Sequence, residues 1–193
     1  RSGEIDKSLL LEKEIADLAK STNAPELIVM SRLMKAIPLA LIGRGEDAMK
    51  LVDDTITYMR GLPVKEEELE DYNMAMYQFY GIAAFIASSS TKDFRYALPY
   101  IRECFNIAEN FHLEDALYYY LKSLYYMYEE PDLAKSLKYL EKSVKDPSLK
   151  GDWLGLYNHI TNELGIMYYM NGMFDKARKV LMDTHTFSKN KRY

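Results

Sequence analysis

Cysteine, proline and glycine are all scarce in this chain of 193 residues. Cys104 is the only cysteine, which excludes an intrachain disulfide and a thiolate metal cluster. It lies in an apolar helical pattern and is expected to be a small buried side chain. No apolar run reaches the roughly eighteen residues that a membrane span needs, and no signal peptide is visible. The compartment stays open between the cytoplasm and a bacterial periplasm.

Motifs for catalysis or metal binding are missing as well. Gly43-Arg44-Gly45 is too short for a phosphate loop and lacks the following Lys-Ser/Thr. His159 and Glu163 share one helix face, but two ligands do not make a metal site without further partners. The acid run 66–71 opens a predicted helix, where carboxylates interact favourably with the helix dipole. The sequence therefore predicts no enzyme activity, no cofactor and no metal.

The net charge of −4 gives no general attraction to nucleic acid, and no nucleic-acid partner is expected. The charge is unevenly distributed, with nine acids against three bases over 45–71 and six bases against one acid over 176–193. The basic end is interpreted as a solvated helix end. Because the chain starts at Arg1, we expect a piece or a processed product of a longer protein.

Apolar residues recur at helical spacing along almost the whole chain, and the strict alternation of strands is absent. Pro38 and Pro99 fall inside the pattern, and each is expected to kink a helix or displace its start. The predicted helices are Glu4–Lys20, Pro25–Ile42, Glu46–Gly61, Glu66–Ser88, Lys92–Asn110, Glu114–Tyr128, Asp132–Lys145, Asp152–Met170 and Phe174–Ser188. The sequence thus predicts an all-α protein.

The last two helices resemble a tetratricopeptide repeat. The matching residues in 162–181 are Leu164, Gly165 and Tyr168 on the first helix, Gly172 in the turn, and Phe174 and Ala177 after it. In that family the small residues let two antiparallel helices approach closely, and the large ones fill the gaps beside them.

Earlier helix pairs match the same pattern less well. The small residues pair as Ala36 with Ala48, Gly81 with Ala97, and Ser123 with Ser136. Steps of 49, 39 and 41 residues separate the second members, against about 34 in the family, and Thr161 stands at the tryptophan position. The resemblance implies one domain over 1–193, a right-handed α-solenoid with a capping helix (1–22) and repeats at about 25–62, 66–110, 114–147 and 152–188. Another helical-hairpin solenoid is the alternative.

The resemblance also implies an inner groove lined by the second, fifth, ninth and twelfth positions of each first helix. The residues assigned to it as a ligand or peptide site are Gln78, Phe85, Tyr120, Leu124, Met127, His159, Asn162 and Tyr169. Met30, Leu33 and Ile37 take these positions in the first repeat, where either the groove continues or the N-terminal helix covers it. The other tyrosines of 118–128 are interpreted as packing between helices, because that helix has no polar face.

The predicted function is a non-catalytic scaffold that binds a protein or an extended peptide. By resemblance, such arrays serve as the sensing segment of a larger bacterial regulator. The positions of a carboxylate clamp hold Leu33, Ile37, Phe79, His159 and Glu163, with no fixed positive charge, so an apolar or neutral ligand is expected. Two alternatives stay open: a homo-oligomerisation module, with the N-terminal helix docking on a second copy, and a small-ligand-binding helical domain.

Overall fold

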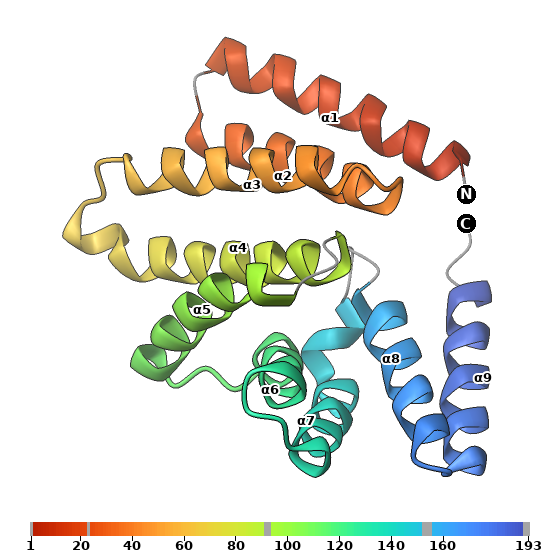
Figure 1. Ribbon diagram of the computed structural model, residues 1–193. Coiled ribbons are helices and arrows are strands. Elements are labelled where there is room, and N and C mark those ends of the chain that lie inside the picture. Colours follow the sequence, from red (N-terminus) through yellow and green to blue (C-terminus); the bar gives the residue numbers. More distant parts are fainter. Residues whose placement is uncertain (1, 23, 91–93, 152–155, 191–193) are drawn as a thin grey trace. The chain divides into compact units, whose positions relative to one another are not determined.

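The computed structural model describes residues 2–22, 24–90, 94–151 and 156–190. Within these ranges the chain forms helices and no strand, so the all-α prediction is confirmed (Figure 1). The α-helices are α1 (Ser2–Thr22), α2 (Pro25–Leu41), α3 (Gly45–Arg60), α4 (Leu69–Ser90), α5 (Leu98–Phe111), α6 (Ala116–Tyr128), α7 (Leu133–Lys145), α8 (Leu156–Met170) and α9 (Phe174–Asn190). Short 3-10 turns lie at η1 (Glu66–Glu68), η2 (Phe94–Tyr96) and η3 (Pro147–Gly151).

The helix boundaries follow local sequence signals. Asp115 and Asp132 cap α6 and α7, and each carboxylate accepts a hydrogen bond from a backbone N–H three residues later. Pro99 takes an early position in α5, which therefore starts at Leu98 and not at the predicted Lys92. Pro38 lies inside α2 as predicted. Gly172 ends the turn before α9 with a φ of 71°, a conformation that glycine adopts without strain.

The chain divides into two compact units, Arg1–Ile107 and Ala108–Tyr193, with the division inside α5. In the first, called the N-terminal unit, α1 packs on α2, α2 on α3, and α3 on α4. The Cys104 side chain is buried, with its Sγ 3.4 Å from the Tyr77 carbonyl oxygen, as expected for a structural thiol. The Arg60 guanidinium donates two hydrogen bonds to the Tyr80 hydroxyl.

The second, called the C-terminal unit, contains two antiparallel hairpins, α6–α7 and α8–α9, and α7 also packs on α8. The Ser123 and Ser136 hydroxyls lie 3.0 Å apart between α6 and α7, and Ser136 also donates to the Ser123 carbonyl. Between α8 and α9, a Cβ added at Gly165 would stand 2.6 Å from Leu181 side-chain atoms. A larger residue at position 165 would therefore require the Leu181 side chain to shift.

The predicted small residues lie on the buried faces of their helices. All eight are buried: Ala36, Ala48, Gly81, Ala97, Ser123, Ser136, Gly165 and Ala177. Burial of this set agrees with the packing that the sequence pattern predicts for these positions. Whether the two units form one domain stays a prediction. Among the described residues, no helix has the length and the apolar character that crossing a bilayer demands.

Candidate protein-binding face of helix α8

Helix α8 has one face that its neighbours within the C-terminal unit leave open. Ile160, Leu164 and Met167 are buried on the opposite side of the helix. At 100° per residue, Asn162, Ile166 and Tyr169 fall on one stripe, and all three side chains are exposed. Asn162 and Tyr169 belong to the sequence-based groove assignment, and Ile166 takes the ninth position of the same helix in that scheme. We call Asn162, Ile166 and Tyr169, with the adjoining Met170 and Phe174, the α8 face.

The fit of α8 against α9 fixes the direction of this face. Gly165 lies against Leu181 of α9, and the Tyr157 ring packs on Phe187 with 4.3 Å between centroids. The Tyr168 hydroxyl donates to Glu141 of α7 at 2.6 Å. With α8 held on both sides, the α8 face is presented by a rigid element and not by a loop.

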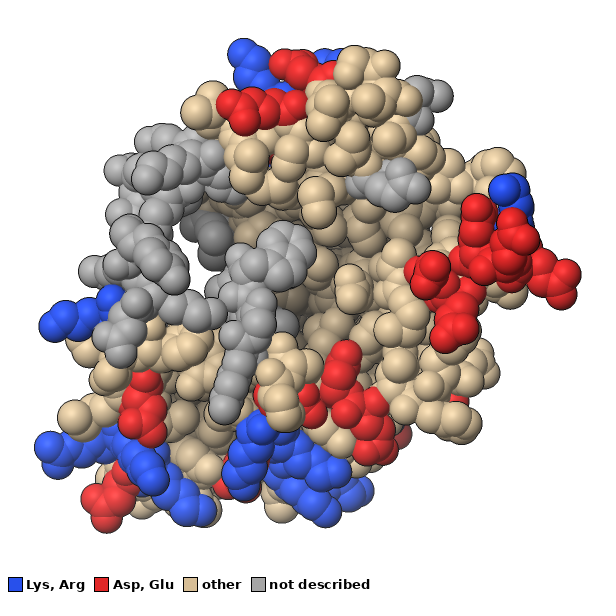
Figure 2. Space-filling model, turned by 180° about the vertical axis from the view of Figure 1, so that it is seen from behind, with Lys and Arg blue, Asp and Glu red and all other residues tan. Residues whose placement is uncertain are grey.

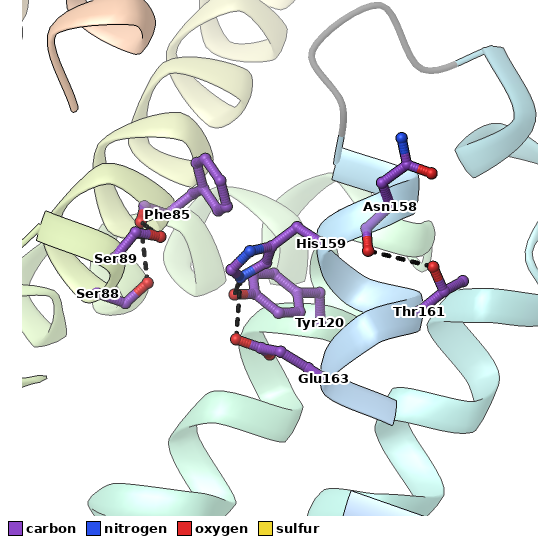
Figure 3. Close-up of polar contacts among 8 residues, drawn as sticks. All are labelled: Phe85, Ser88, Ser89, Tyr120, Asn158, His159, Thr161 and Glu163. Carbon is purple, nitrogen blue, oxygen red and sulfur yellow. Dashed lines mark hydrogen bonds and ion pairs between the residues drawn. The ribbon is translucent and has the colours of Figure 1, made fainter. Parts of the chain in front are cut away.

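The N-terminal part of α8 carries a polar cluster beside this face (Figure 3). His159 Nε2 lies 3.1 Å from the hydroxyl of the fully buried Tyr120 and 2.9 Å from Glu163 Oε1. One ring nitrogen thus meets both groups, and a proton on Nε2 lets the imidazole donate to the carboxylate. Glu163 Oε2 is buried and has no hydrogen-bond partner among the described residues. Burial, with a smaller contribution from the Glu163 charge, raises the pKa of Tyr128.

The C-terminal part of the α8 face is apolar. Ile166 is 56% exposed, Tyr169 64% and Met170 78%. The Tyr169 ring meets Phe174 edge to face, with 5.4 Å between centroids, and Phe174 is itself exposed. Met173 in the turn adds a further partly exposed side chain. A cluster of large exposed apolar side chains of this kind is typical of an interaction surface.

The structure distributes the remaining predicted groove residues differently. Tyr120 and Leu124 on α6 are buried, and Met127 is half-buried, so the first two offer no free surface to a ligand. In the N-terminal unit, Gln78 on α4 is exposed and Phe85 is half-buried. The Phe85 carbonyl accepts hydrogen bonds from the Ser88 and Ser89 hydroxyls (Figure 3).

The first-repeat positions lie on α2, against which α1 packs. Leu33 and Ile37 are buried, and Met30 is exposed. The burial of Leu33 and Ile37 agrees with a groove that does not continue along α2.

Sequence reasoning missed Met170, Met173 and Phe174. Phe174 was expected to fill a gap between helices, as its equivalent does in the family, but the structure leaves most of its ring exposed. The signal was present in the sequence: Met170, Met173 and Phe174 cluster around the Asn171-Gly172 turn, where polar residues are the usual choice.

The tyrosine tract of α6 is packed and is not a free stacking platform. Tyr126 and Tyr139 stack with 5.6 Å between centroids and 7° between planes, and Tyr119 also stacks with Tyr139, with 6.3 Å between centroids. The Tyr119 and Tyr125 hydroxyls donate to Glu114 and Glu130, each at 2.8 Å. The hydrogen bond to Glu114, together with burial, raises the pKa of Tyr119 to about 12.

The described residues offer little that could support chemistry. They contain no group of three or more His, Cys, Asp or Glu side chains placed to hold a metal ion. A shallow cleft of about 320 Å³ lies between the ends of α5 and α6, lined by Ala108, Glu109, His112, Leu113, Glu114 and Tyr118. Its walls present carboxylates and an imidazole but no nucleophile with an adjacent base.

Comparisons with known proteins give a distant likeness. No protein-family model matches the chain, and no curated protein matches it. Among solved structures, MamA 41-end from Desulfovibrio magneticus RS-1 is similar over 96% of this chain and 98% of that chain, with a TM-score of 0.46 and 16% identity. A MamA RS-1 ArsTM double mutant is similar over 96% and 97%, with a TM-score of 0.46 and 17% identity. Values this low do not assign the chain to a family.

Proposed function

We propose that this chain is a non-catalytic scaffold that binds a segment of another protein on the α8 face. The observation that carries the proposal is the exposed apolar cluster of Ile166, Tyr169, Met170 and Phe174 on and beside a helix that is firmly packed on its other sides. Burial of large apolar and aromatic side chains is the main source of affinity at protein interfaces, and such side chains are costly to leave in water.

The polar and apolar parts of the α8 face suit different parts of a ligand. Asn162 is exposed and carries an amide that both donates and accepts hydrogen bonds, which suits the backbone of an extended peptide. Ile166 and Tyr169 follow one and two turns later and suit an apolar side chain of the ligand. Along the helix axis, about 10 Å separates Asn162 from Tyr169, which matches the length of roughly three residues of an extended peptide.

The local charge argues for an apolar or neutral ligand. His159 Nε2 and Glu163 Oε1 lie 2.9 Å apart, so these two side chains meet each other at this end of the face. A ligand that ended in a carboxylate would find no lysine or arginine at the groove positions of α8. On α4, the exposed Gln78 and the half-buried Phe85 occupy the corresponding positions and are proposed as ligand contacts within the N-terminal unit.

The role that fits such a scaffold is an interaction module of a larger sensory or regulatory system. The support for this is the repeat resemblance in 162–181 together with the absence of catalytic motifs from the sequence.

The test is photo-crosslinking in the cells from which the chain comes. A benzophenone amino acid placed at position 166 or 169 is expected to form a crosslink to one protein partner, which mass spectrometry identifies. Tyr96, which is 65% exposed in the N-terminal unit, gives the matched control position for random collisions. Crosslinks at 166 and 169 that merely reproduce those at position 96 would overturn the proposal.

A further inference from the structure

Helix α7 presents a stripe of four exposed lysines. Lys135, Lys138, Lys142 and Lys145 follow one another at steps of three, four and three residues, and all four are exposed. At 100° per residue they fall within about 80° of the helix circumference, with about 5 Å between successive turns. Ser136, Leu140 and Ser143 are buried on the other side of α7. Figure 2 shows Lys and Arg side chains along the lower edge, where Figure 1 draws both the α6–α7 hairpin and the turn between α8 and α9, with Asp and Glu side chains among them.

The stacked tyrosines hold part of this lysine stripe in place. Lys142 Nζ lies 4.7 Å from the centroid of the Tyr119 ring and 5.6 Å from that of Tyr139. Lys135 Nζ lies 4.9 Å from the Tyr126 ring centroid and 3.4 Å from Asp132. An ammonium held over a ring keeps hydrogens free for a second partner, and ordering it in advance lowers the entropy lost on binding. No ion pair to Lys138 or Lys145 is found among the described residues, so these two are the open positions.

An exposed acidic segment in the same chain has matching spacing. Glu66, Glu67, Glu70 and Asp71 are all exposed where η1 leads into α4. The nearest base is Lys65, which contacts Glu67 and Glu68 at 3.8 and 3.7 Å. Glu66 with Glu70, and Glu67 with Asp71, are pairs four residues apart, the step that separates Lys138 from Lys142. Figure 2 shows the dense group of Asp and Glu side chains at the start of α4.

We propose that copies of this chain associate through these two surfaces, with residues 66–71 of one copy on the lysine stripe of α7 in another. The stripe is basic, the segment is acidic, and each repeats at about one helical turn, so several ion pairs can form at once. Because the two surfaces differ, the contact is heterologous, and copies join head to tail. Exposed ion pairs are individually weak and screened by salt, so the association is expected to be reversible and salt-dependent. The stripe shares no residue with the α8 face, and this inference stands apart from the proposed function.

The experiment is sedimentation velocity on the full chain across a dilution series, at about 20 mM and about 500 mM salt. We expect the mass to rise with concentration at low salt and to stay monomeric at high salt. Lys138→Glu with Lys145→Glu should weaken association at least tenfold, as should Glu66→Lys with Glu70→Lys. An equimolar mixture of the neutral variants Lys138→Gln/Lys145→Gln and Glu66→Gln/Glu70→Gln should form a one-to-one complex, because one keeps the acidic segment and the other keeps the stripe.

The matched control is Lys50→Glu with Lys179→Glu, which gives the same net charge as the stripe variant from two exposed lysines elsewhere. Circular dichroism establishes that each variant keeps its helix content, and Lys138→Gln with Lys145→Gln repeats the test without new acids. A wild-type chain that stays monomeric at low salt overturns the proposal. The proposal is also overturned if the control variant weakens association as much as the stripe variant, or if the mixed variants form no complex. The same holds if the chain is a monomer whose lysine stripe binds a single-stranded oligonucleotide instead.

Discussion

Replacing Gly165 by alanine tests the close approach of α8 and α9. The added methyl group would lie 2.6 Å from both Cγ and Cδ2 of Leu181 and 3.2 Å from Cδ1. Carbon atoms in contact normally stand about 3.5–4.0 Å apart. Because Cγ overlaps as well as the methyl groups, a rotation of the end of the Leu181 side chain does not relieve the contact. The whole side chain has to shift, and its exposure of 39% leaves room for that.

Two opposing contributions set the size of the effect. Alanine is favoured over glycine inside a helix by about 0.8–1 kcal/mol, whereas overpacking costs about 1–3 kcal/mol. We therefore expect Gly165→Ala to lower the free energy of unfolding by about 1 kcal/mol. In a Leu181→Ala background the overlap is gone, and Gly165→Ala should raise the free energy of unfolding by about 0.8 kcal/mol. The difference, about 2 kcal/mol, is the coupling between the two positions.

Urea unfolding of the wild type, both single variants and the double variant, followed by circular dichroism, measures this coupling. Gly172→Ala is the control, because its φ of 71° penalises alanine while no atom lies within 4 Å of the added carbon. That substitution should cost about 1–2 kcal/mol with or without Leu181. A Gly165→Ala substitution that stabilises equally in both backgrounds would refute the packing of α8 on α9 described above.

Three further predictions follow from side-chain environments. Under mild peroxide, Met170, which is 78% exposed, should convert to the sulfoxide well before Met76, which is 4% exposed, as peptide mass spectrometry would show. The pKa of Tyr119 is raised to about 12, so its contribution to stability is complete below about pH 10 and is lost as pH rises through about 12. Between these two pH values, the urea midpoint of Tyr119→Phe should therefore fall less than that of the wild type. Tyr120→Phe removes the hydrogen bond to His159 and should lower the free energy of unfolding by about 1 kcal/mol in urea titrations.

Each of these has a contrary outcome. Oxidation of both methionines at one rate would mean that the α8 face is covered. Identical alkaline titrations of wild type and Tyr119→Phe would remove the Glu114 hydrogen bond from the account. A Tyr120→Phe effect that persists undiminished after His159→Ala would show that the two side chains are not coupled.

The fold could be predicted because local signals and repeat chemistry agree. Asp132 and Pro25 mark helix starts, and the small residues Ala36, Ser123 and Gly165 mark contacts between helices. Both kinds of signal act within one helix or one hairpin. The helix predicted from Lys92 begins at Leu98 instead, because Pro99 is tolerated only in the first turn of a helix.

The candidate site could be predicted only in part, because exposure depends on neighbours that are distant in sequence. The repeat positions predict Asn162 and Tyr169 as site residues, and both side chains are exposed. Tyr120 and Leu124 occupy equivalent positions on α6 but are buried, since burial is a property of the packed helices and not of the repeat position. Phe174 shows the reverse: its place after the turn predicts packing between helices, but its ring is exposed.

The most direct measurement of the central claim uses the protein segment captured at positions 166 and 169, made as a synthetic peptide. Its affinity for the full chain, measured by isothermal titration calorimetry, should fall at least tenfold on Ile166→Glu, because a charge would then face the apolar part of the ligand. Leu133→Glu on α7, at a leucine that is 55% exposed, should leave the affinity unchanged. Equal affinity for the wild type and Ile166→Glu would contradict the account, and so would an equal loss for both variants.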